Sequence, residues 1–555
     1  GSGYTGGKNV DVANLEGGIS GDDFGSAVSL SAAGDRLAVG ARNDDGAGNA
    51  NIDTGAAYLF SFTDTDFNGG TLESTIGKGY TGGKNVDVAN LDADDVFGRA
   101  VSLNGVGDRL AVGAPRDDDG GNAGNNTGAT YLFSFTDGDF NGGALKSIIG
   151  RGYTGPKDLS LLSLGNDEFL GSSVSLNAAG DRLAIGAQQD DGAGNSPTST
   201  FTGAAYLFSF TDSDFNGGTL ESTIGSGYTG GKNIDVAVLE DFDRFGSGVS
   251  LNAAGDRLAV GARGDNGAGN VAGDSGAAYL FTFSDTDFNN GTLVSTIGKG
   301  YRDRSKDVNL TLDVRDKFGS SVSLNGAGDR LAVGAPADDG AGNEAIYTGA
   351  AYLFSFADTD FNGGTLESTI GKGFTGGKNV DVANLAFFDL SGVSDEFGSA
   401  VSLNGAGDRL AVGARLDDGE SAAPDSGAAY LFSFTDTDFN GGTLESTIGS
   451  GYTGGKNLDV ANLEDFDRFG SAVSLNAAGD RLAVGAINDA GAGNTATDTG
   501  AAYLFSFTDT DFNGGTLEST LGSGYTGAKN VDVANLEASD EFGSSVSLNA
   551  TGDRL

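Results

Sequence analysis

Short stretches of alternating apolar and polar residues, separated by glycine-rich turns, recur along the whole chain. In the first copy, Val28 and Leu30 share one face of FGSAVSL, because successive side chains of a strand point to opposite faces. Tyr58, Phe60 and Phe62 share one face of AAYLFSF in the same way. SAAGD predicts a tight turn, RLAVGA and TLESTIG predict strands, and KNVDVANL predicts a further extended segment, while no segment has a helical period. Each unit is therefore predicted to be a four-stranded antiparallel meander.

The unit returns about every 73 residues. The Asp of the string GDRL stands at positions 35, 108, 181, 256, 329, 408, 480 and 553. The chain thus divides into seven full repeats, residues 1–521, and the start of an eighth, residues 522–555, which we interpret as belonging to this or a following domain. One such meander cannot bury both faces of its sheet alone, so each unit must pack against its neighbours.

The motif series FGSAVSL, GDRLAVGA and GAAYLF resembles the FG-GAP repeat of integrin α-subunit propellers, and more closely its bacterial variant. The resemblance covers every copy and implies blades arranged radially, seven of them in the integrin case. We therefore predict an all-β fold, a seven-bladed β-propeller of four-stranded antiparallel blades. The strands of the eighth copy have no place in a closed seven-bladed ring, so an eight-bladed ring or an open β-solenoid array stays an alternative.

The composition excludes several classes of function. The 555 residues carry a formal charge of −45, which repels nucleic acid and anionic lipid. There is no Cys and no His, so disulfides, thiolate chemistry and an imidazole base are excluded. The chain has no run of about 18 apolar residues, so no membrane insertion is predicted. Strong acidity without Cys is typical of an extracellular or cell-surface protein in a calcium-containing medium.

Acidic residues recur in two loops of each copy and are candidate ligands for Ca²⁺, which prefers several hard oxygens at a turn. The alternative is that these residues cap turns and keep a glycine-rich surface soluble. The candidates in DDGAGN and TDTDFNGG are Asp44, Asp45, Asp64, Asp66, Asp118, Asp119, Asp190, Asp191, Asp338, Asp339, Asp417 and Asp418. Because the carboxylates recur in every copy, whereas an active site is one asymmetric cluster, we predict that the protein is not an enzyme.

The chain departs from the integrin-type repeat between its first two strands. That family carries a calcium loop of the form DxDxDG there, whereas this chain has only SAAGD or NAAGD. The family's metal site is therefore not carried over, and Arg36 and its equivalents are expected to pair with the turn Asp. An RGD tripeptide, Arg263–Asp265, occupies a position where other copies read RND or PRD, so we interpret it as drift within the repeat.

Two atypical linkers are candidate contact surfaces. The fifth linker concentrates basic residues, and the sixth carries an insertion with apolar residues, which mark contacts between chains when exposed. The candidate interface residues are Arg302, Arg304, Lys306, Phe387, Phe388 and Leu390. Neutral drift in a loop is the alternative.

These features favour a non-enzymatic extracellular structural or adhesive repeat protein, with propeller beads in a bacterial surface, matrix or filament protein. Its expected partners are further copies of itself or other surface and matrix proteins. A carbohydrate-binding, lectin-like propeller is the rival hypothesis, with glycans as partners. Against the rival, the chain has no Trp, and Tyr58 and Phe60 are predicted to lie in the core.

Overall fold

The structure is a computed structural model. It describes residues 24–31, 36–47, 52–61, 71–121, 126–137, 140–194, 200–212, 214–342, 347–385, 395–420, 423–490, 500–522, 531–532 and 546–548. Within these ranges the regular elements are all β-strands, as predicted. Asp64, Asp66, Phe387, Phe388 and Leu390 lie outside the described residues.

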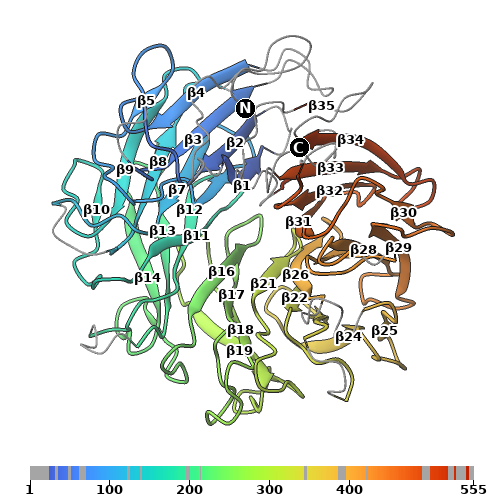
Figure 1. The fold of residues 1–555 in the computed structure, drawn as a ribbon. Helices are drawn as coiled ribbons and strands as arrows, with labels where there is room; N and C mark the ends of the chain where they lie inside the picture. The colour runs from blue at the N-terminus through green and yellow to red at the C-terminus, as the bar shows by residue number, and fades with distance from the viewer. Residues whose placement is uncertain are drawn as a thin grey trace. The chain divides into compact units, whose positions relative to one another are not determined.

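Each repeat forms one sheet of five strands, and the seven sheets are the blades of a β-propeller (Figure 1). Sheets one to three contain β1 (Phe24–Leu30), β2 (Arg36–Ala41), β3 (Ala56–Ser61), β4 (Thr71–Gly77), β5 (Val86–Asp87); β6 (Ala100–Leu103), β7 (Arg109–Ala114), β8 (Ala129–Ser134), β9 (Ala144–Gly150), β10 (Leu159–Ser160); β11 (Leu170–Leu176), β12 (Arg182–Ala187), β13 (Ala204–Ser209), β14 (Thr219–Gly225), β15 (Ile234–Asp235). Sheets four and five contain β16 (Phe245–Leu251), β17 (Arg257–Ala262), β18 (Ala277–Thr282), β19 (Thr292–Lys299), β20 (Val308–Leu310); β21 (Ser321–Leu324), β22 (Arg330–Ala335), β23 (Ala350–Ser355), β24 (Thr365–Gly371), β25 (Val380–Asp381). Sheets six and seven contain β26 (Phe397–Leu403), β27 (Arg409–Ala414), β28 (Ala428–Ser433), β29 (Thr443–Gly449), β30 (Leu458–Asp459); β31 (Phe469–Leu475), β32 (Arg481–Ala486), β33 (Ala501–Ser506), β34 (Thr516–Gly522), β35 (Val531–Asp532).

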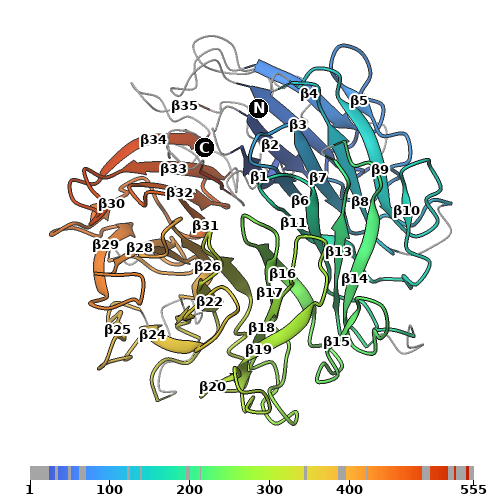
Figure 2. The same cartoon turned by 180° about the vertical axis from the view of Figure 1, so that it is seen from behind.

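The first four strands of a sheet form the predicted antiparallel meander. In the third sheet, β12 pairs with β13 from Arg182↔Ser209 to Ala187↔Ala204, and β13 pairs with β14 with a register shift after Leu207. The extended segment KNVDVANL contributes a fifth strand of two or three residues that runs parallel to the fourth, as in Ile224↔Ile234. Figure 2 shows the fifth strands β15 and β20 at the edge of their sheets, beside β14 and β19. The prediction of four strands is thus confirmed and extended by one.

The hydrophobic core lies between consecutive sheets. One cluster joins Leu59 and Ile76 of the first sheet to Val112, Tyr131 and Phe133 of the second, and equivalent clusters join sheets two and three, five and six, and six and seven. The third strands are buried along nearly their whole length because both of their faces are covered. A fully buried strand stacked between neighbours is what the repeat pattern requires.

The chain groups into two compact units. One comprises Gly1–Asp265 with Tyr279–Leu293, and the other mainly Asn266–Ala278 with Val294–Asp553. The hydrogen bonds and ion pairs at each blade junction lie within one of these units.

Candidate functional site: the blade junctions

The two glycines of the repeat motif meet where one sheet packs on the next. A Cβ on Gly186, in β12, would lie 2.2 Å from the carbonyl oxygen of Gly246, in the first strand of the next sheet. Gly246 itself has φ +88°, and a Cβ there would lie 2.4 Å from the carbonyl oxygen of Ala204. Only residues without a side chain permit this approach of two backbones. The FG and GA glycines are therefore a packing requirement of the junction.

A set of backbone hydrogen bonds, which we call the clasp, joins each linker to the preceding sheet. The linker bonds there to the loop between the second and third strands. Phe242, Arg244 and Phe245 donate their N–H groups to the carbonyl oxygens of Thr200, Phe201 and Thr202 at 2.6, 3.1 and 3.0 Å. Six parallel bridges mark the same clasp along the chain, at Gly55↔Phe97, Gly128↔Leu170, Gly203↔Phe245, Gly276↔Phe318, Gly349↔Phe397 and Gly427↔Phe469. The clasp fixes the spacing of neighbouring blades through the backbone.

The first Asp of each loop is buried and receives tyrosine hydroxyls, and we call it the loop acid. Asp190 Oδ2 accepts hydrogen bonds from the hydroxyls of Tyr206 at 2.5 Å and Tyr228 at 3.0 Å. Asp190 Oδ1 accepts from Tyr228 at 2.9 Å and from the N–H of Gly192 at 2.7 Å. The seven loop acids are Asp44, Asp117, Asp190, Asp265, Asp338, Asp417 and Asp489.

Burial raises the pKa of Asp44 to about 6, although hydrogen bonds from Tyr58, Gly46 and Tyr80 oppose the shift. In the second copy the loop acid is Asp117, which accepts from Tyr131 and Tyr153. The pair in that copy is therefore Asp117 and Asp118, one residue before the pair named from the sequence. The string RDDDGG contains three consecutive Asp residues, so the sequence alone left the register open.

Where a loop has a second Asp, that residue closes the loop instead. Asp45 accepts the N–H of Asp53 at 2.8 Å, and Asp118 accepts the N–H of Asn126 at 2.9 Å. The equivalent residues Asp191, Asp339 and Asp418 each accept backbone N–H groups seven to ten residues further on. Asp119 binds the guanidinium of Arg151 at 3.1 Å. These bonds are the turn-capping role that was the alternative to calcium binding.

A second set of buried carboxyl groups, which sequence analysis missed, lies in the linkers. These linker acids stand two residues before the first strand or its FG motif, at Asp95, Glu168, Asp243, Asp316, Asp395 and Asp467. Each lies beside the loop acid of the sheet that follows it; Gly264, for example, donates its N–H to the carbonyl oxygen of Asp243 at 3.1 Å, one residue before the loop acid Asp265. Burial, and then the charge of Asp117, raise the pKa of Asp95 to about 8.

We expect Asp95→Asn to increase stability at pH 8 to 9 far more than at pH 5, measured in excess chelator. The pKa of Asp95 is about 8 in the folded state against about 4 in an unfolded chain, so the folded state binds the proton more tightly. Stability from this group is therefore present below pH 4 and is lost as the pH rises toward 8. Asn mimics the neutral acid. Melting temperatures of both proteins from pH 5 to 9 should diverge with rising pH, and parallel curves would contradict the shift.

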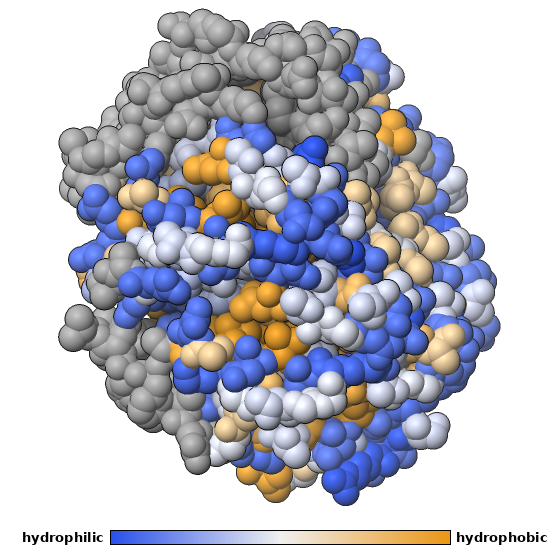
Figure 3. Space-filling model, turned by 90° about the vertical axis from the view of Figure 1, so that its right-hand side faces the viewer, coloured by the Kyte–Doolittle hydropathy of each residue, from blue (hydrophilic) through white to orange (hydrophobic). Residues whose placement is uncertain are grey.

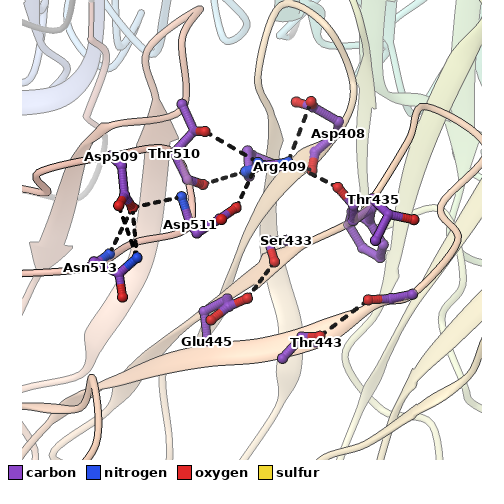
Figure 4. A network of polar contacts seen from close by, with 12 residues as sticks. Asp408, Arg409, Ser433, Thr435, Thr443, Glu445, Asp509, Thr510, Asp511 and Asn513 are labelled. Carbon is purple, nitrogen blue, oxygen red and sulfur yellow. Dashed lines mark hydrogen bonds and ion pairs between the residues drawn. The ribbon is translucent and has the colours of Figure 1, made fainter.

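The acidic turn between the third and fourth strands bonds to itself and to the preceding blade. Asp509 accepts from Asn513, and Arg409 of β27 binds Asp511 at 3.0 Å and Asp408 at 3.3 Å (Figure 4). Arg409 also donates to the carbonyl oxygen of Thr510. The expected local pairing of Arg with the turn Asp is thus present.

The cross-blade partner of this Arg was not predicted, because it lies about 100 residues away. Equivalent cross-blade ion pairs join Arg182 to Asp287 and Arg330 to Asp438. In a chain of such negative charge, these Arg side chains place positive charge where two acidic blades meet.

The candidate metal ligands that the structure describes are surrounded by hydrogen-bond donors of the protein. The loop acids accept O–H and N–H groups, and Asp212 of the acidic turn accepts three bonds from Asn216 and one from the N–H of Asp214. These carboxylates thus already accept hydrogen bonds from the protein itself. Among the described residues, no three or more acidic side chains converge in a way that could hold a metal ion.

Part of the basic cluster of the fifth linker is engaged in hydrogen bonds within the protein. Lys306 donates to the carbonyl oxygen of Asp360 at 2.6 Å, as Lys232 does to that of Asp287. Arg304 donates its N–H to Asp307 at 2.8 Å and reaches Thr296 at 3.5 Å. Arg302 is exposed. Of the three, Arg302 is placed best for a contact with another molecule.

The carboxylate of the RGD tripeptide is buried. Its Asp265 is a loop acid with 1% of its surface exposed, and it accepts the hydroxyl of Tyr279 at 2.5 Å. Gly264 packs against the carbonyl oxygen of Phe242. A receptor could not reach this carboxylate without opening the loop.

The family model for the FG-GAP repeat matches six segments of the chain, residues 16–60, 89–133, 239–281, 313–354, 391–432 and 461–505. These are FG-GAP repeats. Each matched segment covers the loop, the clasp and the first three strands described above. The third copy is outside the matched segments, and there Leu170 replaces the Phe of the FG. A comparison with curated proteins finds no significant match.

Three solved structures are similar to this chain at low sequence identity. Sqt1 from Chaetomium thermophilum is 12% identical, with 92% of this chain and 85% of that chain covered and a TM-score of 0.43. A periplasmic gluconolactonase, PpgL, of Pseudomonas aeruginosa is 12% identical, with 76% and 85% covered and a TM-score of 0.39. The Swd1 β-propeller domain of Myceliophteria thermophila is 10% identical, with 85% and 96% covered and a TM-score of 0.42. The fold assignment rests on the seven sheets and the family match.

Proposed function

We propose that this FG-GAP propeller is a non-enzymatic structural or adhesive protein of the cell surface or extracellular matrix. The supporting observation is that the same carboxylates, Arg side chains and Tyr hydroxyls recur at successive junctions, where they bond to neighbouring parts of the protein. Side chains used in this way hold blades together. An array of nearly identical, acidic, tightly joined blades suits a scaffold that presents its outer surface repeatedly.

The surroundings of the aromatic residues favour a scaffold over a lectin. Tyr58 has none of its surface exposed and Phe60 only 6%, so neither can stack on a sugar. In the coloured part of Figure 3, hydrophilic residues alternate with groups of hydrophobic residues. Exposed aromatic residues such as Phe242 and Phe466 stand in the linkers. In the described part of the chain, no helix is long and apolar enough to cross a membrane.

Electron microscopy of the native material tests the proposal directly. A scaffold should form ordered beads or fibres without added ligand, and a glycan array should show no selective binding. Dispersed single particles together with selective binding of one glycan would favour the lectin instead.

Self-association through the atypical linkers is the expected form of assembly. Propellers of like charge repel over about a Debye length, roughly 8 Å at physiological salt, so close packing needs a local positive charge. We expect Arg302→Ser to shift sedimentation toward smaller species by removing the exposed cation, and Phe387→Ser with Phe388→Ser to do the same by removing apolar area.

Lys317→Ser, which removes an exposed positive charge near the end of the same linker, serves as the matched control. Assembly of both sets of variants like the parent would show that these linkers are not the interface.

A further inference from the structure

The linker residue at which the clasp begins differs from copy to copy. In the five linkers where the structure describes it, this residue is Asp94, Asp167, Phe242, Arg315 or Phe466, and its φ lies between +60° and +74°. Asp tolerates this left-handed conformation because its short side chain can hydrogen-bond locally, whereas a phenylalanine is strained there. Strained residues of this kind persist where they serve a function, so the two phenylalanines are candidates for one.

Both phenylalanines remain largely open to solvent. At the second junction, Asn126 donates to the carboxylate of Asp167 at 2.8 Å, so the polar residue at this position bonds within the protein. Phe242 meets the ring of Phe201 edge-on at 5.7 Å and still keeps 52% of its surface exposed. Phe466 keeps 49% exposed. Exposed aromatic rings on an otherwise polar linker mark a contact surface.

An arginine stands two residues after each of these phenylalanines. In the part of the chain that the structure describes, the guanidinium groups of Arg244 and Arg468 have no hydrogen bond or ion pair, and Nε of Arg468 is buried without a partner. Glu396, at the same position of the sixth linker, binds Arg415 at 2.7 Å. Among 77 acidic and 32 basic side chains, an arginine without a carboxylate partner is unexpected. The sequence LEDFDRFG, at 239–246 and again at 463–470, thus supplies an exposed ring and an unpaired cation twice.

The acidic turn between the third and fourth strands has the complementary chemistry. Bonds from Asn216 hold the pKa of Asp212 below its usual range, so this carboxylate stays ionised. Its Oδ2 accepts one of these bonds, at 2.8 Å, which leaves a lone pair for a guanidinium. Gly217 of the same turn is exposed and has no side chain, so an aromatic ring can pack on its backbone. The first Asp of this turn is exposed in six copies, at Asp137, Asp212, Asp285, Asp358, Asp436 and Asp509.

We propose that Phe242 with Arg244, and Phe466 with Arg468, each bind an acidic turn of a second copy of this chain. The guanidinium pairs with the first Asp of the turn, and the ring packs on the glycine that follows. Charge favours a second copy as the partner, because the described part of every copy carries six such turns. Linker and turn are different surfaces, so the contact does not close on itself and can propagate. This inference rests on the proposed function, since it names the surfaces through which the scaffold assembles.

Sedimentation velocity of the full chain tests the contact. We expect the parent to associate and excess NaCl to reverse the association, because salt screens exposed charges. Phe242→Asp with Phe466→Asp should weaken association at least about tenfold, as expected for loss of aromatic anchors. This double variant should fold, because Asp94 occupies the same backbone position. Val271→Asp with Val314→Asp, which makes the same change of charge at two exposed apolar residues, should associate like the parent.

The role of the cations is tested by Arg244→Glu with Arg468→Glu. The sixth linker carries Glu396 at this position, so the variant should fold, and it should lose association as the phenylalanine variant does. A photo-crosslinking analogue of phenylalanine at position 242, in chains mixed with an isotope-labelled copy, identifies the partner surface. The crosslink should reach a labelled peptide that contains residues 212–218 or an equivalent turn.

The outcomes separate this contact from the proposed scaffold function. A parent that assembles while both double variants assemble equally well would overturn the contact alone, as would a crosslink to a surface other than the acidic turns. A parent that stays monomeric at every salt concentration would overturn the contact and also count against the scaffold.

Discussion

Phe245→Ala should lower the free energy of unfolding by about 3 to 5 kcal/mol, the range for removing a fully buried aromatic side chain. Phe245 is the Phe of the FG motif and is completely buried. Its ring meets Tyr279 edge-on at 5.3 Å and Phe281 at 6.1 Å, both in β18 of the same blade, so truncation leaves a cavity in the packed face of that blade. Denaturant unfolding monitored by tyrosine fluorescence measures the loss.

Phe245→Leu is the matched control, because the third copy carries Leu170 at this position with none of its surface exposed. We expect this variant to lose clearly less stability than Phe245→Ala. Equal losses in both variants would mean that the ring contacts, rather than the filled volume, hold the junction.

Gly246→Ala should be the second severe substitution, with a loss of about 3 kcal/mol or more. Its φ of +88° disfavours any side chain, and the added Cβ would lie 2.4 Å from a backbone oxygen that cannot move without opening the clasp. Gly230→Ala separates the two causes, since Gly230 has φ +84° and nothing within 4 Å of a Cβ.

For Gly230→Ala we expect only the conformational cost, about 1 to 2 kcal/mol. Thermal melts of both variants measure the difference, which reports the close approach of the two blades. Similar melting temperatures would show that the two backbones can move apart enough to accommodate the added methyl group.

The alternation of apolar and polar residues predicted the strands because each strand belongs to a sheet with a regular face. Tyr58 and Phe60 were assigned correctly to the core on this pattern alone. For the fifth strand the sequence predicts only an extended segment. Two or three paired residues, as at Ile234, are too few to show an alternating pattern. Its parallel direction depends on the path of the linker, which no local signal specifies.

The roles of the acidic residues could not be derived from composition. Asp44 meets Tyr80, 36 residues away, only after the fourth strand returns beside the loop, so the turn looked like a solvent-exposed cation site. The linker acids did carry a signal, the acidic residue two positions before the FG of successive copies, as in Asp243 and Asp316. The regular recurrence of this acidic residue indicates a structural position. The signal is hard to recognise because the chain has many other carboxylates.

The clasp and the contacts around it have a consequence for how the array can change in length. Ser402 accepts the N–H of Leu475 at 3.0 Å, and Ser474 accepts the N–H of Leu548, in the eighth copy, at 2.9 Å. Each copy thus presents the same joining surface to the copy that follows it. A recombination event that duplicates or deletes one whole repeat would bring together a loop and a linker that already match. The gene can therefore gain or lose blades in single steps without inventing a new interface.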